Sequence, residues 1–509
     1  MSYNILLENI IRDVGGCGRF QWITAVIVYA ATCIVSWSIL AMTFNGQQPD
    51  FMCSKADMGN SSVNQSVFDN VCHVNQTDNC DGYIFNDDIN TVVNEWNLVC
   101  DSKWIVAMIT TIQIAGDLVG CFISGHLGDM IGRKPTFFLS LIILILFNII
   151  AYFSINWQMY ATIRFFIGME ITPTRWRAII ISVPAWTMGA GIFALACWGL
   201  RNWRSIHLVT AATGLPVLFT ICFVQESPRL LLAKRRYDDA ENVIKRIANI
   251  NGKPAPNMSK VIEEAKEHEN ETKPKYSVLY LFKSRHSIKL TIGLLFIWMI
   301  VSYTYYGLTF GIQSLAGDLY LNMLLMNTIE CPAFFSIMFI ANKFGSKYCC
   351  ILFFMLSGIC GLVVGVIQYV DTPHSGLITN VFALASKMGI AVGWRCLIVY
   401  TIEIFPTVVR TTAYGLCNTS ARIGGMVAPQ IVFLNDKIPG LMYFLSAVLM
   451  IISSVIFFTF PDTKDKPLEE TLESFNNNIQ STTEHNTVKI HCDSNGNEKA
   501  NPTENETYL

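Results

Sequence analysis

Four ionisable side chains stand inside stretches of sequence that are otherwise apolar: Glu330, Lys387, Arg395 and Arg422. An isolated charge at the centre of a membrane costs about 3 kcal/mol or more, so each one is a candidate functional group. Two arginines favour a carboxylate or a sulfate, because each guanidinium can pair with such a group in bidentate fashion. Glu330 is a possible counter-ion. The charges therefore predict an anionic or zwitterionic ligand.

Two of these charges also have a purely structural explanation. Lys387 lies near the end of its apolar stretch, where a lysine can extend its ammonium group to the membrane surface. Glu330 could neutralise one arginine without any ligand being involved. Both alternatives stay open at the level of sequence.

Candidate aromatic residues lie in three of the apolar stretches, one of which also carries Lys387 and Arg395. Their faces could stack on a bulky amphipathic ligand or hold a quaternary ammonium group by cation–π contact. Taken singly, such a residue more often packs in a core or anchors a helix at the membrane surface. The candidate pocket residues are Trp186, Trp298, Tyr305, Tyr306 and Trp394.

The composition indicates which elements position these side chains. The chain has 509 residues, of which 52% are hydrophobic and 15% charged, and its mean hydropathy is +0.40. Most of it must therefore contact lipid. A net charge of −2 provides no field for nucleic acid, so DNA- and RNA-binding functions are excluded.

Eleven apolar stretches reach the roughly 20 residues that a helix needs to cross the hydrocarbon. Their limits are Phe20–Phe44, Trp104–Leu127, Thr136–Ile155, Ala178–Leu200, Ile206–Val224, Ile288–Phe310, Leu319–Ala341, Tyr348–Tyr369, Leu377–Ile402, Thr411–Leu434 and Gly440–Phe460. A further piece, Tyr160–Met169, would extend only about 15 Å as a helix. It is too short to span.

The loop 45–103 has the composition of an extracellular segment. It holds nine acidic residues against two basic ones, together with three glycosylation sequons and four cysteines. Sequons and disulfides are features of extracellular chains, and four cysteines allow three pairings, which sequence does not decide between. The sequons are Asn60, Asn64 and Asn75, and the cysteines are Cys53, Cys72, Cys80 and Cys100.

The loop 226–287 is basic, with thirteen Lys and Arg against nine Asp and Glu. Positive loops stay in the cytosol, so this loop and the tail from residue 462 are predicted to be cytosolic. The tail is polar and predicted to be disordered. Its last four residues, Glu506–Leu509, could add as a strand to a PDZ domain.

The second half of the chain repeats the first. Glu170–Arg177 shares an E-x-x-P-x-x-x-R spacing with Glu403–Arg410, at an offset of 233 residues. Gly125–Lys134 has a weaker counterpart in Asn342–Lys347, at an offset of 213. The first half is thus 20 residues short, about one membrane crossing. The deficit falls at the undersized Tyr160–Met169.

Topology supports a missing crossing. The sequon loop and the basic loop lie on opposite sides only if an odd number of spans separates them, yet four full stretches do. We interpret the chain as a six-plus-six architecture that lacks most of its fourth span. An exon-skipped form, a faulty gene model and a natural rearrangement are the three explanations.

This arrangement resembles the major facilitator superfamily, whose loop between spans 2 and 3 has the pattern G-x-x-x-D-x-x-G-R-K that Gly125–Lys134 matches. The Cys-rich first loop, Glu226–Leu232 and Glu403–Arg410 are together similar to the organic cation, organic anion and carnitine transporter family. The match runs from about residue 18 to 471. The chain departs from the family pattern at Asn342 and Ser346 and directly after Met169.

The resemblance implies an all-α polytopic membrane protein with the major facilitator fold. Two pseudo-repeated six-helix bundles would contain 11 full spans plus one truncated span. The expected divisions are a cytosolic N-terminus (1–19), a first transmembrane half (20–225), a cytosolic central loop (226–287), a second half (288–461) and a cytosolic tail (462–509).

The resemblance also implies roles for individual residues. Arg395 and Arg422 align with cavity-facing positions, and Arg422 stands where anion and carnitine carriers have arginine and cation carriers an acid. A cytosolic charge cluster would lock the two halves together in the outward-facing state, although a simple solvated turn is the alternative for its first two members. Its members would be Asp129, Arg133, Glu170, Arg177, Glu226, Arg229, Glu403 and Arg410.

The implied function is secondary transport of small organic ions across the plasma membrane by alternating access. Organic anions, or zwitterions such as carnitine-like compounds, are the expected substrates. The alternatives are an organic cation transporter and a non-transporting splice-type variant; a sugar porter is disfavoured by the Cys-rich loop and the two arginines. No Walker, HExxH or GxSxG motif indicates an enzyme, and no cofactor or metal is expected.

Overall fold

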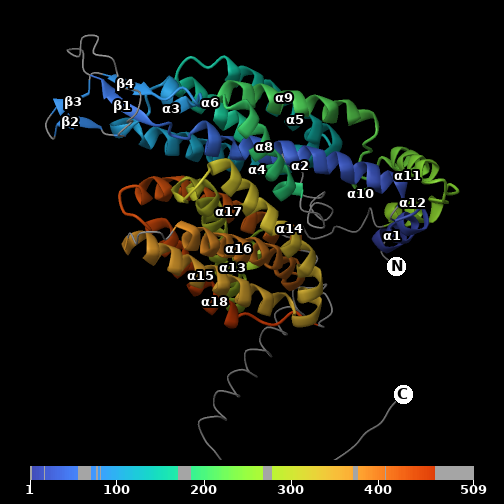
Figure 1. Cartoon of the computed structure of the whole chain (residues 1–509). Helices are drawn as coiled ribbons and strands as arrows, with labels where there is room; N and C mark the ends of the chain where they lie inside the picture. The colour runs from blue at the N-terminus through green and yellow to red at the C-terminus, as the bar shows by residue number, and fades with distance from the viewer. Residues whose placement is uncertain are drawn as a thin grey trace, which may run out of the picture.

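The helices form two bundles that lie against each other, the first blue to green and the second yellow to red in Figure 1. This computed structural model describes residues 3–16, 18–54, 70, 72–75, 78–80, 82–169, 185–267, 278–370, 376–406 and 409–464. The predicted all-helical fold of two bundles is confirmed.

The first bundle consists of α2 (Arg19–Asn45), α4 (Trp104–Met130), α5 (Arg133–Tyr152), α6 (Trp157–Gly168), α8 (Ala185–Leu200) and α9 (Trp203–Phe219). The second consists of α13 (Arg285–Phe310), α14 (Leu319–Phe344), α15 (Ser346–Val370), α16 (Gly376–Ile404), α17 (Arg410–Asn435) and α18 (Leu441–Phe458). The bundles meet where α4 packs against α17 and α8 against α14.

Within the described residues, eight helices are long and apolar enough to cross a membrane. They are α2, α4, α5, α9, α13, α15, α16 and α18. α14 and α17 have 26 residues each, while α8 is described over 16. The chain is therefore a multi-pass membrane protein, and the count of eleven full spans and one truncated span stays a prediction.

The short helix α6 reaches only the middle of the first bundle. It begins beside the end of α2, where Nδ2 of Asn45 donates a hydrogen bond to the hydroxyl of Tyr160 at 3.0 Å. It ends against the middle of α4, where a Cβ added at Gly168 would collide with the carbonyl oxygen of Gln113. Small residues at such crossings let two membrane helices approach closely.

The described part of helix α8 starts at a similar depth and runs back toward the same end. Sγ of Cys33, in the middle of α2, donates to the carbonyl of Ala185 at 3.3 Å. Just beyond the other end of α8, the main-chain N–H of Asn90 donates to the carbonyl of Arg201 at 2.9 Å. Residues 170–184, which join α6 to α8, lie outside the described part, so the truncated fourth span also stays a prediction.

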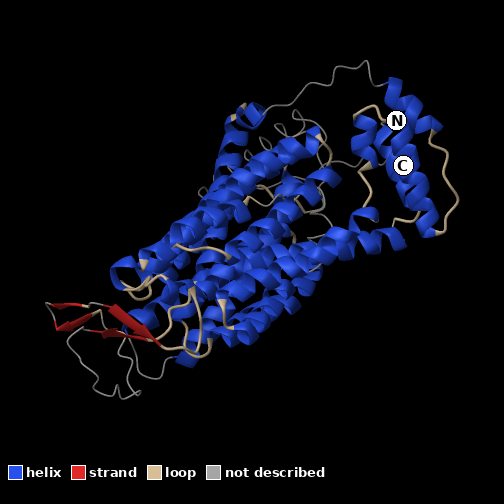
Figure 2. Cartoon of the chain, turned by 90° about the horizontal axis from the view of Figure 1, so that it is seen from above, coloured by secondary structure: helices blue, strands red, loops and turns tan. Residues whose placement is uncertain are grey.

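The loop after α2 carries two small antiparallel sheets at one end of the molecule (Figure 2). β1 (Phe51–Ser54) pairs with β4 (Gly82–Phe85), and β2 (His73–Asn75) pairs with β3 (Asp78–Asn79). The short helices α3 (Val92–Glu95) and η1 (Cys100–Ser102) lead from the sheets into α4. Asn75 ends β2, whereas Asn60 and Asn64 lie outside the described residues.

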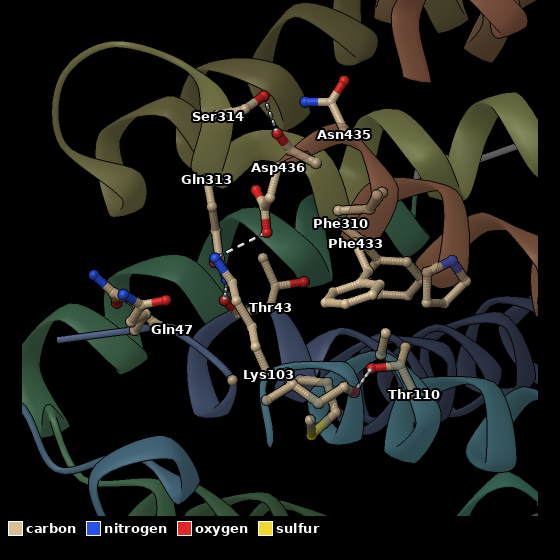
Figure 3. Close-up of a pocket in the computed structure, with 18 of the residues that line it drawn as sticks. Thr43, Gln47, Lys103, Thr110, Phe310, Gln313, Ser314, Phe433, Asn435 and Asp436 are labelled. Atoms are coloured by element: carbon tan, nitrogen blue, oxygen red, sulfur yellow. Dashed lines mark hydrogen bonds and ion pairs between the residues drawn. The ribbon is translucent and has the colours of Figure 1, made fainter. Parts of the chain in front are cut away.

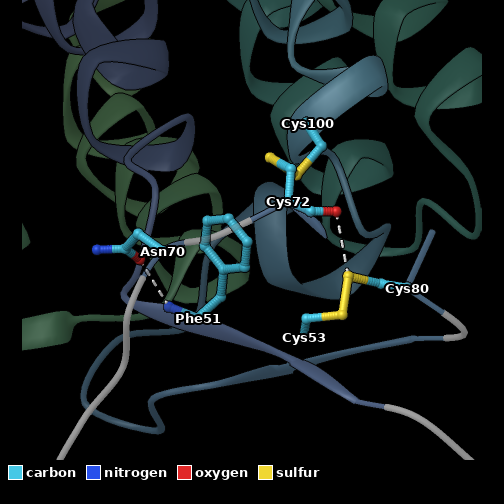
Figure 4. Close-up of a disulfide and its surroundings, with 6 residues drawn as sticks. All are labelled: Phe51, Cys53, Asn70, Cys72, Cys80 and Cys100. Atoms are coloured by element: carbon cyan, nitrogen blue, oxygen red, sulfur yellow. Dashed lines mark hydrogen bonds between the residues drawn. A yellow bond between two sulfur atoms is a disulfide. The ribbon is translucent and has the colours of Figure 1, made fainter. Parts of the chain in front are cut away.

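The cysteines of this loop pair as Cys53–Cys80 and Cys72–Cys100, with Cα atoms 5.5 and 5.7 Å apart (Figure 4). This is one of the three pairings that the sequence allowed. The second disulfide joins the sheets to η1 at the start of α4, and therefore fixes the loop to the first bundle.

The opposite end of the molecule carries α1 (Tyr3–Asp13), α10 (Pro228–Ala233), α11 (Tyr237–Asn251) and α12 (Ser259–Glu267) (Figures 1 and 2). Leu7, Leu231, Ile244 and Val261 belong to one apolar cluster there. The N-terminal segment and the basic central loop thus fold together, far from the disulfide-bonded loop. The next element, η5 (Val278–Phe282), leads into α13, and η6 (Gly311–Ser314) follows it.

Candidate functional site

Lys387 of α16 and Glu330 of α14 form an ion pair inside the protein. Nζ of Lys387 lies 3.6 Å from Oε1 of Glu330, and the two side chains are only 2% and 6% exposed. The same Nζ donates to Oγ1 of Thr309 at 2.6 Å and lies 3.2 Å from the centre of the Tyr305 ring. Lys387 therefore does not extend to the membrane surface. From the first bundle, Oγ1 of Thr187 donates to Oε2 of Glu330 at 3.5 Å.

Arg422 of α17 forms a second ion pair, which joins the two bundles. Its Nη1 lies 2.6 Å from Oδ2 of Asp117 on α4, and the side chains are 19% and 10% exposed. Nη1 also donates to the hydroxyl of Tyr306 at 3.3 Å. The guanidinium thus contacts a carboxylate of the first bundle and the hydroxyl of an aromatic residue of its own bundle.

Arg395 is the third cation of this region. It lies on α16 two helical turns after Lys387 and interacts electrostatically with Glu330 and Tyr305. In this part of the described structure, Lys387, Arg395 and Arg422 lie near the two carboxylates of Glu330 and Asp117. The fully buried Arg164 of the first bundle adds a fourth cation, so positive charges outnumber the buried carboxylates. The neighbouring rings give these charges a low-dielectric surrounding, which strengthens electrostatic contacts.

Aromatic side chains from both bundles surround these charges. Trp394 lies 5.2 Å from Tyr305, 6.5 Å from Tyr306 and 6.4 Å from Trp298, measured between ring centres. Trp186, from α8 of the first bundle, packs against the apolar core that contains Trp298, Tyr305 and Tyr306. All five aromatic residues selected from the sequence are thus brought together. We call the group of Trp186, Trp298, Tyr305, Tyr306 and Trp394 the aromatic cage.

A cavity of about 490 Å³ lies between the bundles at the end nearer the disulfide-bonded loop (Figure 3). Phe310 lines it and stacks on Tyr306 of the cage, with ring centres 5.8 Å apart. Nζ of Lys103 lies 2.9 Å from Oδ2 of Asp436 across the cavity, so an ion pair ties α4 to α17 at this end.

A second contact between the bundles, a hydrogen bond, borders the same cavity. Nε2 of Gln313 in η6 donates to the carbonyl of Thr43 in α2 at 2.9 Å. The contact joins the end of α13 to the end of α2, which are the first helices of the two halves. In this structure the bundles are therefore held together at the end that carries the disulfides.

At the other end, Glu226 caps the N-terminus of α5. Its carboxylate accepts hydrogen bonds from the main-chain N–H groups of Arg133 and Lys134, both at 3.1 Å. A carboxylate at this position is favoured by the helix dipole. Gly132 has φ +112°, and a Cβ there would lie 2.5 Å from Oε2 of Glu226. The glycine thus leaves room for the carboxylate.

The second half has a related arrangement at the N-terminus of α15. Oε2 of Glu403 accepts hydrogen bonds from Oγ of Ser346 at 2.8 Å and from Oγ1 of Thr463 at 2.7 Å. Gly345, with φ +85°, precedes the helix as Gly132 precedes α5. The two glycines are separated by the 213 residues that the sequence repeat predicts.

The remaining members of the predicted cytosolic cluster are placed as follows. Nε of Arg410 donates to the carbonyl of Phe405 at 3.1 Å, and Arg229 pairs with Glu8 of α1 at 3.1 Å. These contacts, like those of Glu226 and Glu403, join residues of one half. Glu170, Arg177 and the side chain of Asp129 lie outside the described part. The role of this cluster as a lock stays a prediction.

The sequence reasoning missed Asp117. It lies within the predicted span Trp104–Leu127, and the rule that selected Glu330, namely a charge inside an apolar stretch, also selects it. It missed a buried polar cluster in the first bundle as well. Nε2 of His207 lies 2.9 Å from the hydroxyl of Tyr160, and its Nδ1 lies 2.8 Å from Oδ1 of Asn148.

Comparison with known proteins identifies the family. The profile of the family "Sugar (and other) transporter" matches residues 24–475. The chain is 30% identical to mouse solute carrier family 22 member 4 over 415 residues, which cover 77% of this chain and 74% of the relative. It is 29% identical to mouse organic cation/carnitine transporter 2 over 416 residues, which cover 77% and 73%.

The chain belongs to the organic cation, organic anion and carnitine transporter family of the major facilitator superfamily. The xylose transporter XylE from E. coli, solved in an inward-open conformation, has the same fold, with a TM-score of 0.64 and 14% identity over 89% of this chain and 99% of that one. This transporter is accordingly a secondary transporter and not an enzyme.

Proposed function

We propose that this transporter moves small organic zwitterions or anions that carry a carboxylate, by alternating access of its two halves. The observation that carries the proposal is the excess of cations over buried carboxylates beside an aromatic cage built from both bundles. Arg422 and Arg395 would bind the carboxylate, because a guanidinium pairs with it in bidentate fashion. The relatives named organic cation/carnitine transporter support this substrate class.

The aromatic cage would receive the other end of the substrate. Its rings can stack on an apolar group or hold an ammonium by cation–π contact. Glu330 lies near both Lys387 and Arg395, so one carboxylate faces two cations. A zwitterion suits this arrangement because its two ends meet a guanidinium and a set of rings within one site.

The membrane orientation belongs to the same proposal. The disulfide-bonded loop with Asn60, Asn64 and Asn75 would face the outside of the plasma membrane, and both termini would be cytosolic. The cytosolic cluster around Glu226 and Glu403 would join the halves in the outward-facing state. The C-terminal residues Glu506–Leu509 would offer a PDZ ligand.

Uptake by cells that express the full chain tests the substrate class. Glycine betaine and choline are a matched pair, because both carry a trimethylammonium group and only betaine has a carboxylate. We expect saturable uptake of betaine or carnitine, at least tenfold lower uptake of choline, and loss of betaine uptake in Arg422→Gln. Arg246→Gln, on the exposed face of α11, is the control and should keep wild-type uptake.

The alternative functions make different predictions for the same assay. Robust choline uptake without betaine uptake would support an organic cation transporter, in which Glu330 and the cage hold the cation. Absence of uptake for both compounds and for organic anions, with the chain present at the cell surface, would support a non-transporting variant.

A further inference from the structure

We propose that Asp117 competes with the substrate carboxylate for Arg422. Its carboxylate pairs with Arg422 when no substrate is bound, and a substrate carboxylate displaces it. The displacement would loosen the contact between α4 and α17. This inference rests on the proposed function and adds a residue that couples substrate binding to the movement of the two halves.

The position of the pair suits such a role. Asp117 lies at the midpoint of α4 (Trp104–Met130), and Arg422 lies at the midpoint of α17 (Arg410–Asn435). The 2.6 Å contact therefore joins the two halves at the middle of the membrane, where midplane binding sites of transporters are found.

The pair stands within a polar seam along α4 and α17. On one side, Nε2 of Gln430 donates to Oγ1 of Thr111 at 3.0 Å, and this hydroxyl donates to the carbonyl of Met426 at 3.1 Å. On the other side, Nδ2 of Asn418 lies 3.7 Å from Sγ of Cys121. The neighbouring contacts are neutral, so loss of the Asp117–Arg422 pair removes the strongest tie in the central part of the seam.

The contact with Asp117 leaves part of the Arg422 guanidinium unused. Nη1 donates to the hydroxyl of Tyr306 in the aromatic cage, and Nε has no hydrogen-bond partner among the described residues. A guanidinium has five N–H donors in a planar fork. A ligand seated against Tyr306 would therefore find free donors on the same group that Asp117 holds.

A second guanidinium of the first half, that of Arg164 on α6, contacts α4 one turn before Asp117. Gln113, one turn earlier on the same face of α4, accepts a hydrogen bond from Nη2 of Arg164. Arg164 is fully buried. When a substrate carboxylate binds Arg422, repulsion between the two carboxylates would turn Asp117 toward Arg164. Asp117 would then contact a residue of its own half and no longer join the two halves.

The thermodynamic consequence is specific. A ligand shifts a conformational equilibrium only through a difference in its affinity for the two states. Competition for Arg422 supplies that difference, because the substrate carboxylate binds fully only after Asp117 has left. Removing the Asp117 charge should therefore tighten ligand binding and at the same time abolish the ligand's effect on the seam.

Binding to the purified full-length chain in nanodiscs tests the affinity. For Asp117→Asn we expect the Kd of glycine betaine or carnitine to fall about five- to tenfold, with no change for choline. The exposed Asp238→Asn is the control, and Asp117→Asn combined with Arg422→Gln should lose the gain. If Asp117→Asn does not fold, Asp117→Glu should lower the Kd about twofold, because its longer side chain distorts the pair. An unchanged or raised Kd in the folded variant would overturn the proposal.

Cross-linking of the seam gives a readout that is independent of affinity. With Thr111→Cys and Gln430→Cys, whose native side chains are in contact, betaine should slow disulfide formation at least threefold in the wild-type background and have no effect with Asp117→Asn. The same slowing in both backgrounds would overturn the role of Asp117. Failure of betaine and carnitine to bind the wild-type chain at all would instead refute the proposed function.

Discussion

At the scale of single residues, the site is governed by charges that compensate one another inside the membrane. Lys387 and Glu330 are both almost completely buried, and each would be costly without the other. A buried pair adds little net stability over apolar residues, but breaking it leaves one uncompensated charge. We therefore interpret Lys387 and Glu330 as one compensated ion pair and not as two independent ligands.

The first prediction concerns that pair. Glu330→Gln should destabilise the protein by about 3 to 5 kcal/mol, because it leaves the buried ammonium of Lys387 without a counter-ion. Thermal unfolding in detergent measures the loss. The double variant Glu330→Gln with Lys387→Met should recover most of the stability but not the transport. Equal stability of the single and double variants would contradict this account.

The second prediction concerns Gly132. Its φ of +112° and the 2.5 Å approach to Glu226 leave no room for a side chain, so Gly132→Ala should cost about 1 to 3 kcal/mol. Gly128→Ala is a matched control: it lies in α4 with nothing within 4 Å of the added Cβ, and should be neutral or slightly stabilising. Both variants are compared by thermal unfolding; similar losses would show that the capped turn is not rigid.

At the scale of elements, the contact between α4 and α17 joins the two bundles beside the site. It brings Asp117 to Arg422 and also carries Lys103–Asp436 at the end nearer the disulfides. The latter side chains are 38% and 46% exposed, and an exposed pair contributes about 0 to 1 kcal/mol. The pair can therefore open during each transport cycle.

The third prediction follows from that position. A disulfide between Lys103→Cys and Asp436→Cys should hold the bundles together at this end and stop uptake, because alternating access requires them to separate there. Uptake before and after treatment with a reducing agent measures the effect, with each single cysteine variant as control. Full uptake by the cross-linked protein would mean that this end does not open.

At the scale of the whole molecule, the sequence repeat predicts a first half about 20 residues shorter than the second. The described parts of α6 and α8 have 12 and 16 residues, and the segment 170–184 that joins them lies outside the described residues. The disulfide-bonded loop and the α10–α12 cluster lie at opposite ends of the molecule (Figures 1 and 2). A shortened fourth span would give the odd number of crossings that this arrangement requires.

The fourth prediction addresses this shortening. Insertion of about 20 apolar residues, the length of one span, between Met169 and Glu170 should raise betaine uptake if the chain is a shortened form of a full transporter. Uptake of both forms is compared at equal surface amounts, with an insertion in the tail after residue 470 as control. No gain would indicate that the chain works at its present length.

The sequence by itself determined the class of molecule, the two-bundle fold, the repeat and most of the charged and aromatic candidates. These follow from hydropathy, loop charge and motif spacing, which are local properties of the chain. The cage residues Trp186 and Trp394 were selected as aromatic side chains inside apolar stretches that could stack on a ligand.

Only the tertiary structure decided which groups meet. The partner of Arg422 is Asp117, about 300 positions earlier in the chain, and the partner of Lys387 is Glu330 on a neighbouring helix. The same holds for the choice among the three disulfide pairings. Such contacts depend on how helices rotate and pack against one another, and a periodicity read along one helix does not contain that information.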